Sequence, residues 1–415
     1  MTMPKSAQRP KSTKLSRDTS PALECEPNLD RAMELVMALL AIEGGSCHEG
    51  AVAKFVTDQL RRGGVSAASI RHDTAHRRSV FGGDIGNLIC KLPGRGRGMT
   101  DAPRRLLMAH LDTVPICVGT RPVRRGGQIV SGRPDRGLGA DDRAGVAVLL
   151  CAALEVLERR HHPPLTFLFT VQEEIGLYGA RCASLGLLGR PRLAFNFDGG
   201  PASKMSIGAT GGYRMDIVVE GLASHAGGAP EQGVSAIAVA SLAVADLTRN
   251  GWHGAIHQDG RSGTSNVGVI NGGAATNVVC DRVEIKAEAR SHDPKFRERI
   301  VREIRAAFDR AAAEVTSAAG RKGRVHIEGR LDYEAFRLAD DEPCLLAAEQ
   351  AIRDAGGQPI RAISNGGLDA NWLSARGIPT VTLGAGQIGQ HTPAEALDVA
   401  EFQLACRVGL RLAMG

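Results

Sequence analysis

The sequence is poor in aromatic residues and has no long apolar run. Aromatic side chains make up 4% of its 415 residues, so a core must rest on valine, leucine, isoleucine and alanine. No stretch of about 18 apolar residues occurs, which leaves no candidate for a membrane-spanning helix. The first ~20 residues lack the apolar segment of a secretory signal. Their content of Ser, Pro, Lys and Arg predicts a disordered basic tail over residues 1–26.

The cysteines do not form the pattern of a disulfide framework or a zinc–thiolate site. There are nine of them, an odd number, and none forms a CxxC pair. They are typical of reduced thiols in a cytoplasmic protein. The formal net charge is only +6, and no basic stripe with interleaved aromatic residues is present. Neither a nucleic acid nor a membrane is therefore an expected partner.

The chain is longer than one ordinary domain, and its patterns predict two. Helical spacing alternates with short apolar strands in the first half, and the same alternation resumes after residue 336. The helices are expected at residues 28–42, 48–64, 141–160 and 342–356 and at the C-terminus, and the strands at 86–92, 104–114, 164–174, 192–200 and 378–386. This order predicts a layered α/β sheet with helices on both faces, built from residues 27–205 and 337–415.

The segment between these two parts has a different character. Its strands alternate polar and apolar residues, as half-exposed strands do. Strands are expected at 213–221, 264–273, 277–291 and 324–336, and helices at 233–249 and 294–315. The order is β-α-β-β-α-β, so residues 206–336 are expected to form an inserted, ferredoxin-like domain.

Histidines and acids recur where the predicted strands end. His110 and Asp112 share a face of one strand, and a metal-bound imidazole usually donates its second N–H to a carboxylate. Three more segments follow, with acids at "GADDRAG", "QEEIG" and "NFDGG". Each pattern alone has a simpler interpretation, such as a core histidine, a helix cap or a solvated strand end.

Taken together, these segments predict a metal site. The carboxyl ends of strands in open α/β sheets are where ligands bind. Together with a downstream histidine in "GQHTPAEALD", the set offers two imidazoles, one shared carboxylate and further acids. That inventory suits two zinc-like divalent ions bridged by one carboxylate.

The ordered motifs "HLDTVP", "GADDRAG", "QEEIG", "FDGG", "ASHAG", "ATNVV" and "GQHTP" resemble one known family. It is the co-catalytic zinc peptidase family that includes peptidase T, glutamate carboxypeptidase and the aminoacylases. The resemblance covers the chain from about residue 28. It implies a three-layer α/β/α catalytic domain that holds two Zn²⁺ per subunit, with Co²⁺ or Mn²⁺ as alternatives. The inserted domain would serve as a dimerisation or lid domain.

The resemblance also implies a role for each matching metal ligand. His110 and Asp198 would bind one zinc, Glu174 and His391 would bind the other, and Asp141 would bridge the two.

Three further positions would support the chemistry of these ligands. Asp112 would orient the first histidine, and Glu173 would be the general base. A cis peptide bond is expected between Asp141 and Asp142.

Three residues of the inserted domain match substrate-binding positions. His225 would donate a hydrogen bond to the oxyanion, in the family from the partner subunit, so a homodimer is expected. Asn277 and Arg290 would hold the substrate backbone and its carboxylate, because an arginine fork binds a carboxylate in bidentate fashion. A cross-strand ion pair is the alternative for Arg290.

The acid at position 198 favours the tripeptidase and dipeptidase branches, and hence hydrolysis of small peptides by an enzyme close to peptidase T. One position departs from the tripeptidase pattern, because Asn365 stands where that pattern has arginine. An N-acyl amino acid amidohydrolase or a carboxypeptidase of the same family is the alternative. An inactive metal-binding dimer and a nucleic-acid binder that uses the basic tail are the more distant hypotheses.

Overall fold

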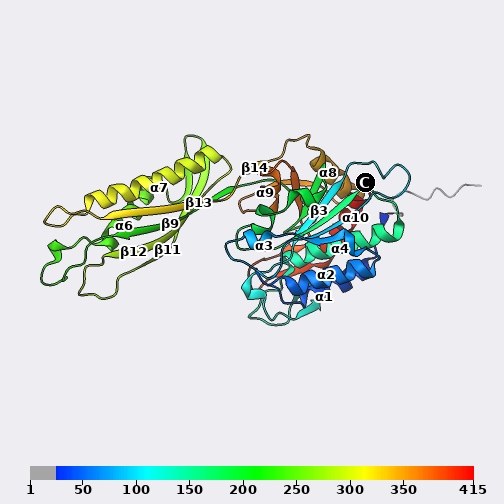
Figure 1. Cartoon of the computed structure of the whole chain (residues 1–415), viewed down its shortest axis with the longest axis horizontal. Coiled ribbons are helices and arrows are strands. Elements are labelled where there is room, and N and C mark those ends of the chain that lie inside the picture. Colours follow the sequence, from blue (N-terminus) through cyan, green and yellow to red (C-terminus); the bar gives the residue numbers. More distant parts are fainter. Residues whose placement is uncertain (1–24) are drawn as a thin grey trace, which may run out of the picture.

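The computed structural model describes residues 25–415, which fold into a larger and a smaller unit (Figure 1). The basic tail expected over residues 1–26 lies outside the described residues except for its last two positions. In the larger unit, nine strands form one mixed sheet in the order β1-β2-β6-β3-β7-β16-β8-β14, with β15 also paired to β8. The strands are β1 (Ile70–His72), β2 (Leu88–Leu92), β3 (Arg105–His110), β6 (Leu165–Thr170), β7 (Leu193–Phe197), β8 (Lys204–Ala209), β14 (Phe336–Arg337), β15 (Ile360–Ser364) and β16 (Thr380–Leu383).

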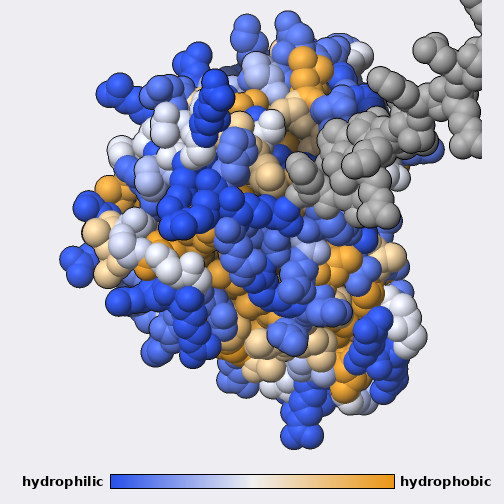
Figure 2. Space-filling view, turned by 90° about the vertical axis from the view of Figure 1, so that its right-hand side faces the viewer, coloured by the Kyte–Doolittle hydropathy of each residue, from blue (hydrophilic) through white to orange (hydrophobic). Residues whose placement is uncertain are grey.

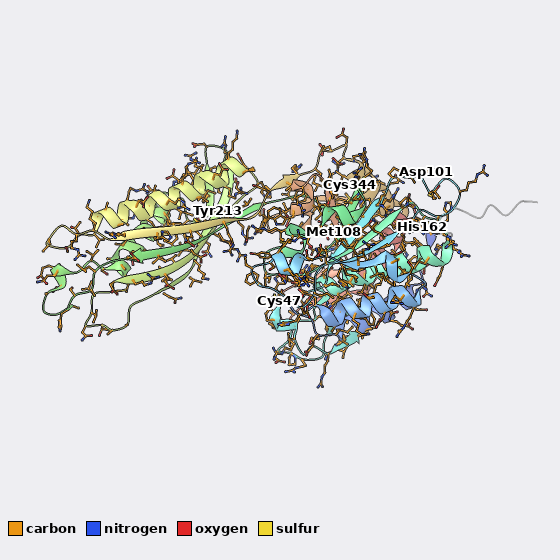
Figure 3. All side chains as sticks on the ribbon, viewed as in Figure 1. Cys47, Asp101, Met108, His162, Tyr213 and Cys344 are labelled. Carbon is orange, nitrogen blue, oxygen red and sulfur yellow. The ribbon has the colours of Figure 1, made fainter. Side chains whose placement is uncertain are left out.

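The central strands are buried on both faces. On β3, Leu107 and Ala109 point into one apolar cluster, whereas Leu106 and Met108 point into another on the opposite face. This follows from the alternation of side chains along a strand. Met108 is labelled within the large sheet in Figure 3. The larger cluster is covered by α1, α2, α4, α8 and α10, and the smaller one by α5 and α9.

Capping side chains mark where several of these helices begin. The Asn28 side chain accepts a hydrogen bond from the backbone N–H of Arg31, and Asp398 accepts from Ala400 and Glu401. The helices of the larger unit are α1 (Leu29–Leu40), α2 (Gly50–Arg62), α3 (Ala75–Arg78), α4 (Ala140–Arg159), α5 (Tyr178–Arg181), α8 (Pro343–Asp354), α9 (Asp369–Ala375) and α10 (Val399–Met414). No helix in residues 25–415 is both long enough and apolar enough to cross a membrane.

The smaller unit is a five-stranded antiparallel sheet in the order β10-β11-β12-β9-β13, with two helices on one face. Its elements are β9 (Gly211–Glu220), α6 (Ala236–Arg249), β10 (Gly254–Gln258), β11 (Arg261–Gly272), β12 (Arg282–Ser291), α7 (Pro294–Glu314) and β13 (Arg324–Tyr333). Apolar residues of both helices pack on the sheet in a core of their own. The unit extends away from the larger one along the longest axis of the molecule (Figure 1).

Two crossings connect the units. β8 of the large sheet is followed, after Thr210, by β9 of the small sheet, and the chain returns from β13 to β14. Tyr213 marks the start of β9 near this junction in Figure 3. The Asn371 side chain donates to the carbonyl oxygens of Thr210 and Glu334, at 2.9 and 2.7 Å. One buried amide therefore holds both crossings. Residues 206–209 of β8 and Phe336 of β14 belong to the large sheet, so the crossings lie a few residues inside the bounds of 206 and 336 expected for the inserted domain.

A four-stranded sheet, β17-β18-β5-β4, lies beside the main one. It is built from β4 (Pro122–Arg125), β5 (Gln128–Ser131), β17 (Gln387–Ile388) and β18 (Ala396–Asp398). The end of the larger unit in Figure 2 is mostly hydrophilic, with apolar residues in scattered groups.

The predicted α/β fold class with an inserted unit is confirmed, but the strand inventory was incomplete. The sequence patterns missed β10, a short hairpin strand in which only Ile256 is buried. They also missed β1, β8, β15 and the four strands of the minor sheet. These strands are two to six residues long, which is too short for a clear alternating pattern.

Replacing Asn371 with alanine should remove both hydrogen bonds at the crossings. The exposed fraction of Asn371 is 0%, so water would not replace the lost amide. The carbonyl groups of Thr210 and Glu334 would then each lose a hydrogen-bond donor. We expect the free energy of unfolding to fall by about 1–3 kcal/mol, measured by urea denaturation. Gln350→Ala is the control, because within residues 25–415 the exposed Gln350 side chain bonds only the exposed Asp354. This change should alter stability by less than about 0.5 kcal/mol. Equal effects of the two variants would contradict the role of Asn371.

Candidate metal and catalytic site

Three parallel strands deliver the first residues of the site. β3 pairs in parallel with β6 on one side and β7 on the other. Their carboxyl ends therefore meet at one edge of the sheet. His110 ends β3, Glu173 and Glu174 follow β6, and Asp198 follows β7. The amino end of α4 brings Asp141 to the same edge, and the loop after β17 brings His391.

Asp141 lies between the two histidines. Its Oδ1 is 3.1 Å from Nε2 of His110, and its Oδ2 is 3.4 Å from Nε2 of His391. Nε2 of His391 is also 3.0 Å from Oε2 of Glu174. The peptide bond between Asp141 and Asp142 is cis, as the resemblance implied. Each oxygen of one buried carboxylate thus faces a different imidazole, which is the arrangement that a bridging ligand requires.

Three groups of side chains in the described residues offer ligand atoms within 4.8 Å of one another. Two of them share only Asp141: one adds His110 and Asp198, and the other adds Glu174 and His391. This partition is the one implied by the resemblance. The third group joins His110 with Glu173 and Glu174, so geometry alone also allows Glu173 as a ligand.

The charges of the cluster fit divalent cations. Burial, reinforced by Asp141, raises the pKa of Asp198 to about 7. Burial and the neighbouring acids also raise the pKa of Glu173 well above its usual range. Hydrogen bonds to Asp141 and Glu174 raise the pKa of His391 to about 10. Such shifts arise where crowded carboxylates lack enough counter-charge, and divalent cations bound by these oxygen and imidazole ligands would supply it.

Asp112 connects several parts of the cluster. Its backbone oxygen is 3.1 Å from Nδ1 of His110 and its Oδ1 is 3.5 Å from the same nitrogen. Its carboxylate also accepts the backbone N–H groups of Glu173 at 3.0 Å and Glu174 at 3.2 Å, and the hydroxyl of Ser46 at 2.6 Å. The sequence predicted only the contact with histidine. The structure shows that the same aspartate also fixes the backbone of both glutamates.

Two further buried acids support the loop around the cis peptide bond. Asp142 accepts the backbone N–H of His110 at 3.1 Å and the side-chain amide of Gln387 at 3.0 Å. Glu395 accepts the backbone N–H groups of Gly139 and Asp141, at 2.7 and 3.0 Å. The sequence analysis predicted no role for Glu395, although this residue lies four positions after His391 in "GQHTPAEALD".

Glu49 supports the loop that follows β6 and carries Glu173 and Glu174. Its Oε1 accepts the backbone N–H groups of Cys47 at 3.0 Å and Gln172 at 2.9 Å, while Oε2 is buried without a hydrogen-bond partner in the described residues. Burial, with Asp112 nearby, raises the pKa of Glu49 to about 8. No sequence signal pointed to this residue, which lies in an ordinary helix start.

The cluster opens into a cavity of about 340 Å³. Asp141, Glu173, Glu174, Asp198 and His391 line one part of it. The rest of the lining comes from the β7–β8 turn, the start of β8, and the loops that precede α9 and β18, namely Gly199, Gly200, Lys204, Ser206, Ser364, Gly367, Leu368 and Gln390. A volume of this size accommodates a small ligand.

The residues expected to bind substrate do not line this cavity. His225 and Asn277 are exposed on adjoining loops of the smaller unit, where the backbone N–H of Ala226 donates to the backbone carbonyl oxygen of Asn277 at 2.9 Å. Arg290 lies on β12 and its guanidinium makes two hydrogen bonds to Glu288, each 3.0 Å long. The ion pair considered for Arg290 is thus present, although it is formed within one strand.

Comparisons with known proteins agree on one family. Residues 106–415 match the profile described as peptidase family M20/M25/M40. The chain is 32% identical over 378 residues to the uncharacterized protein YqjE of Bacillus subtilis strain 168, which covers 90% of this chain and 95% of that one. It is 27% identical to carboxypeptidase G2 of Pseudomonas sp. strain RS-16, over 79% of this chain and 76% of that one. The crystal structure of aminopeptidase PepT from Bacillus cereus ATCC 10987 superposes with a TM-score of 0.81 at 31% identity, over 94% of this chain and 98% of that one.

Metal analysis of ligand variants should separate the three groups of side chains. We expect about two Zn²⁺ per chain, with Asp141→Asn lowering affinity for both ions by at least about 100-fold because both groups lose a shared ligand. His391→Ala should lose one ion, and Glu173→Gln should keep two. Equilibrium dialysis with elemental analysis measures the stoichiometry.

The control for this experiment is Asp259→Asn, which removes an exposed acid of the smaller unit and should bind as the wild type does. Loss of an ion from Glu173→Gln would instead assign Glu173 as a ligand.

The raised pKa of Glu49 predicts a pH-dependent difference in stability. The folded protein would hold a proton on Glu49 up to about pH 8, whereas the unfolded chain releases it near the usual value of 4.5. The free energy of unfolding should therefore fall as pH rises from 4.5 to about 8, by an amount on the order of a few kcal/mol. Glu49→Gln cannot lose that proton, so its stability relative to wild type should increase between pH 5 and pH 8.5 in urea denaturation.

Glu298→Gln is the control for this prediction, because Glu298 is exposed on α7. A stability difference between Glu49→Gln and wild type that stays constant with pH would show that Glu49 is ionised in the folded protein.

Proposed function

The chain belongs to peptidase family M20/M25/M40, and on that basis we propose that it is a two-metal aminopeptidase acting on short peptides. Hydrolysis of peptide bonds follows from family membership. The proposal adds the metals, the residue roles and the size of the substrate. The observation that carries it is the position of Asp141, whose two carboxylate oxygens each face one histidine beside a cavity that Glu173 also lines.

In the proposed assignment, five side chains hold two divalent cations. His110 and Asp198 hold one, Glu174 and His391 hold the other, and Asp141 is shared. Bound cations of this kind supply the Lewis acidity that lowers the pKa of a water molecule and polarises a carbonyl group.

Glu173 is the proposed general base. It lines the cavity, whereas its neighbour Glu174 contacts His391. In this proposal Glu174 is a metal ligand and Glu173 transfers a proton. Glu173 takes a proton from the attacking water and later gives it to the leaving amine. The Asp112 carboxylate accepts hydrogen bonds from the backbone N–H groups of both glutamates and thereby fixes the position of the proposed base.

His225 is the proposed donor to the oxyanion, and it would reach the site from a second subunit or by closure of the smaller unit. Its Nδ1 accepts the backbone N–H groups of Gly227 at 3.1 Å and Gly228 at 2.9 Å. In the neutral ring the proton is then on Nε2, which leaves a donor free to point outward. Asn277, on the adjoining loop, and Arg290 would hold the substrate backbone and its carboxylate in the same assembly. A homodimer through the smaller unit is part of this proposal.

The choice of an aminopeptidase rests on similarity to PepT of Bacillus cereus, which covers nearly the whole chain, and on an aspartate at position 198. Asn365, the departure from the tripeptidase pattern, has its Oδ1 3.1 Å from Nε2 of His292 in the smaller unit. Similarity to carboxypeptidase G2 keeps carboxypeptidase and N-acyl amino acid hydrolase activity as the second candidate.

We also propose a cytoplasmic location, since all nine cysteines are free thiols in the structure.

Zinc-loaded protein should hydrolyse a tripeptide with free ends. The same tripeptide with an acetylated amino terminus, and an N-acetyl amino acid, should be poor substrates. Glu173→Gln should lower kcat by about 100- to 10,000-fold, because proton transfer is lost while the metal ligands stay. Product formation followed by chromatography gives both results.

Cleavage of the N-acetylated compounds in place of the free tripeptide would assign the protein to the deacylase or carboxypeptidase branch. A fully active Glu173→Gln variant with two metals bound would remove Glu173 from the mechanism.

A further inference from the structure

One cation in the cavity has no role in the chemistry proposed above. Lys204, at the start of β8, lines the same cavity as Asp198 and Glu173. Among the hydrogen bonds and ion pairs of residues 25–415, none involves its ammonium group. The side chain is half-buried. A lysine that is partly withdrawn from water and unpaired beside a binding site is available to a ligand.

The turn before β8 shows where this ammonium group lies. Gly199 and Gly200 follow Asp198 directly, and both have φ angles in the left-handed region, +76° and +80°, which favours glycine. A Cβ built on Gly200 would lie 3.5 Å from Cδ and 3.8 Å from Nζ of Lys204. A Cβ built on Gly199 would lie 3.2 Å from Nε2 of Gln390. The two bare glycines therefore leave room for two donor side chains directly after a metal-ligand candidate.

Gln390 completes the pair of donors. It precedes His391 in the same loop and also lines the cavity, and its side-chain amide is likewise absent from the hydrogen bonds of the described residues. Ser206, two residues after Lys204 on β8, shares the lysine's face of the strand and lines the cavity as well. One cation, one amide and one hydroxyl thus line the same cavity as the metal-ligand candidates, and all three can donate to an anion.

The arginine expected from the resemblance is differently placed. Nε and Nη2 of Arg290 donate to the carboxylate of Glu288, and Arg290 is not among the residues that line the cavity. Lys204 is the only lysine or arginine among the lining residues of the described chain.

We propose that Lys204, assisted by the Gln390 amide, binds a carboxylate group of the substrate beside the metal-ligand cluster. The inference rests on the proposed peptide hydrolysis and narrows its substrate class to peptides that carry a carboxylate near the scissile bond. That carboxylate has two sources, the C-terminus of a very short peptide or an acidic side chain.

Matched substrate pairs distinguish the two sources. Tri-alanine against its C-terminal amide tests the terminal carboxylate, and Ala-Glu-Ala amide against Ala-Gln-Ala amide tests the side chain. Zinc-loaded wild type should prefer the charged member of one pair by about 10- to 100-fold in kcat/KM, mainly through KM. Lys204→Met should abolish this preference, and Lys204→Glu should reverse it. Lys295→Met, a change of an exposed lysine on α7, should keep it.

Equilibrium binding supplies a readout that does not depend on turnover. By calorimetry, zinc-loaded wild type should bind N-acetylalanine at least about 10-fold more tightly than Lys204→Met does, with equal metal content in both. The difference should vanish for N-acetylalanine amide. If Lys204 only offset the charge of the acids, Lys204→Met would change kcat/KM for every substrate by the same factor. The preference for the charged member of a pair would then remain.

The outcomes separate the two proposals. Hydrolysis without preference in either pair, or a preference that survives Lys204→Met, overturns the role of Lys204 and leaves the peptidase intact. Failure to cleave any peptide, together with anion binding that depends on Lys204, overturns the proposed substrates and supports the carboxylate subsite. Binding of N-acetylalanine that is equal in wild type and Lys204→Met overturns the subsite directly.

Discussion

The constraint on which the site depends is the crowding of buried carboxylates at one edge of the large sheet. Asp141, Glu173, Glu174 and Asp198 share a small volume in which burial disfavours their charged forms. Two imidazoles carry too little charge to balance four carboxylates. Burial, reinforced by Asp141, raises the pKa of Asp198 to about 7. Such an arrangement is costly for a protein that only needs to be stable. A cluster of buried acids is expected where divalent cations bind, because the cations would supply the positive charge that the cluster lacks. Each acid could then serve as a ligand or a base.

Holding these acids in place requires a second layer of groups, and here that layer is built largely from backbone N–H donors. Asp112, Glu49 and Glu395 are themselves acids, and each accepts two or more backbone N–H groups from segments that carry site residues. Hydrogen bonds from several backbone N–H groups to one carboxyl group are directional. They fix loops that the sheet alone would leave free beyond the strand ends. The same layer explains why so many carboxylates are buried around the site without being candidates for catalysis.

The residues expected to hold metals lie together at one edge of the sheet, whereas His225, Asn277 and Arg290 do not line the cavity there. The contacts that support the cluster had no signal in the sequence. Strand ends can be recognised from local apolar runs, and the meeting of parallel strands at one edge then follows from general rules of α/β sheets. The support from Glu395 to the Asp141 backbone spans 254 residues of sequence, and that from Glu49 to Gln172 spans 123. No local pattern reports such contacts. The short strand β10 was missed for a related reason, since its place in the sheet depends on its hairpin partner β11 more than on its own residues.

The division of the chain into two units has a consequence for specificity. The metal-ligand candidates, the proposed base and Lys204 all belong to the large sheet and its loops, so their mutual geometry is fixed by one core. His225, Asn277 and Arg290 belong to the smaller unit, whose own core is separate and whose crossings to the large sheet are held by Asn371. A carboxylate bound at Lys204 would therefore be selected before any closure or dimer contact is needed, because Lys204 and Gln390 both belong to the larger unit. Groups from the smaller unit would then act on a substrate that is already oriented, and their contribution would appear in the chemical step more than in the initial binding.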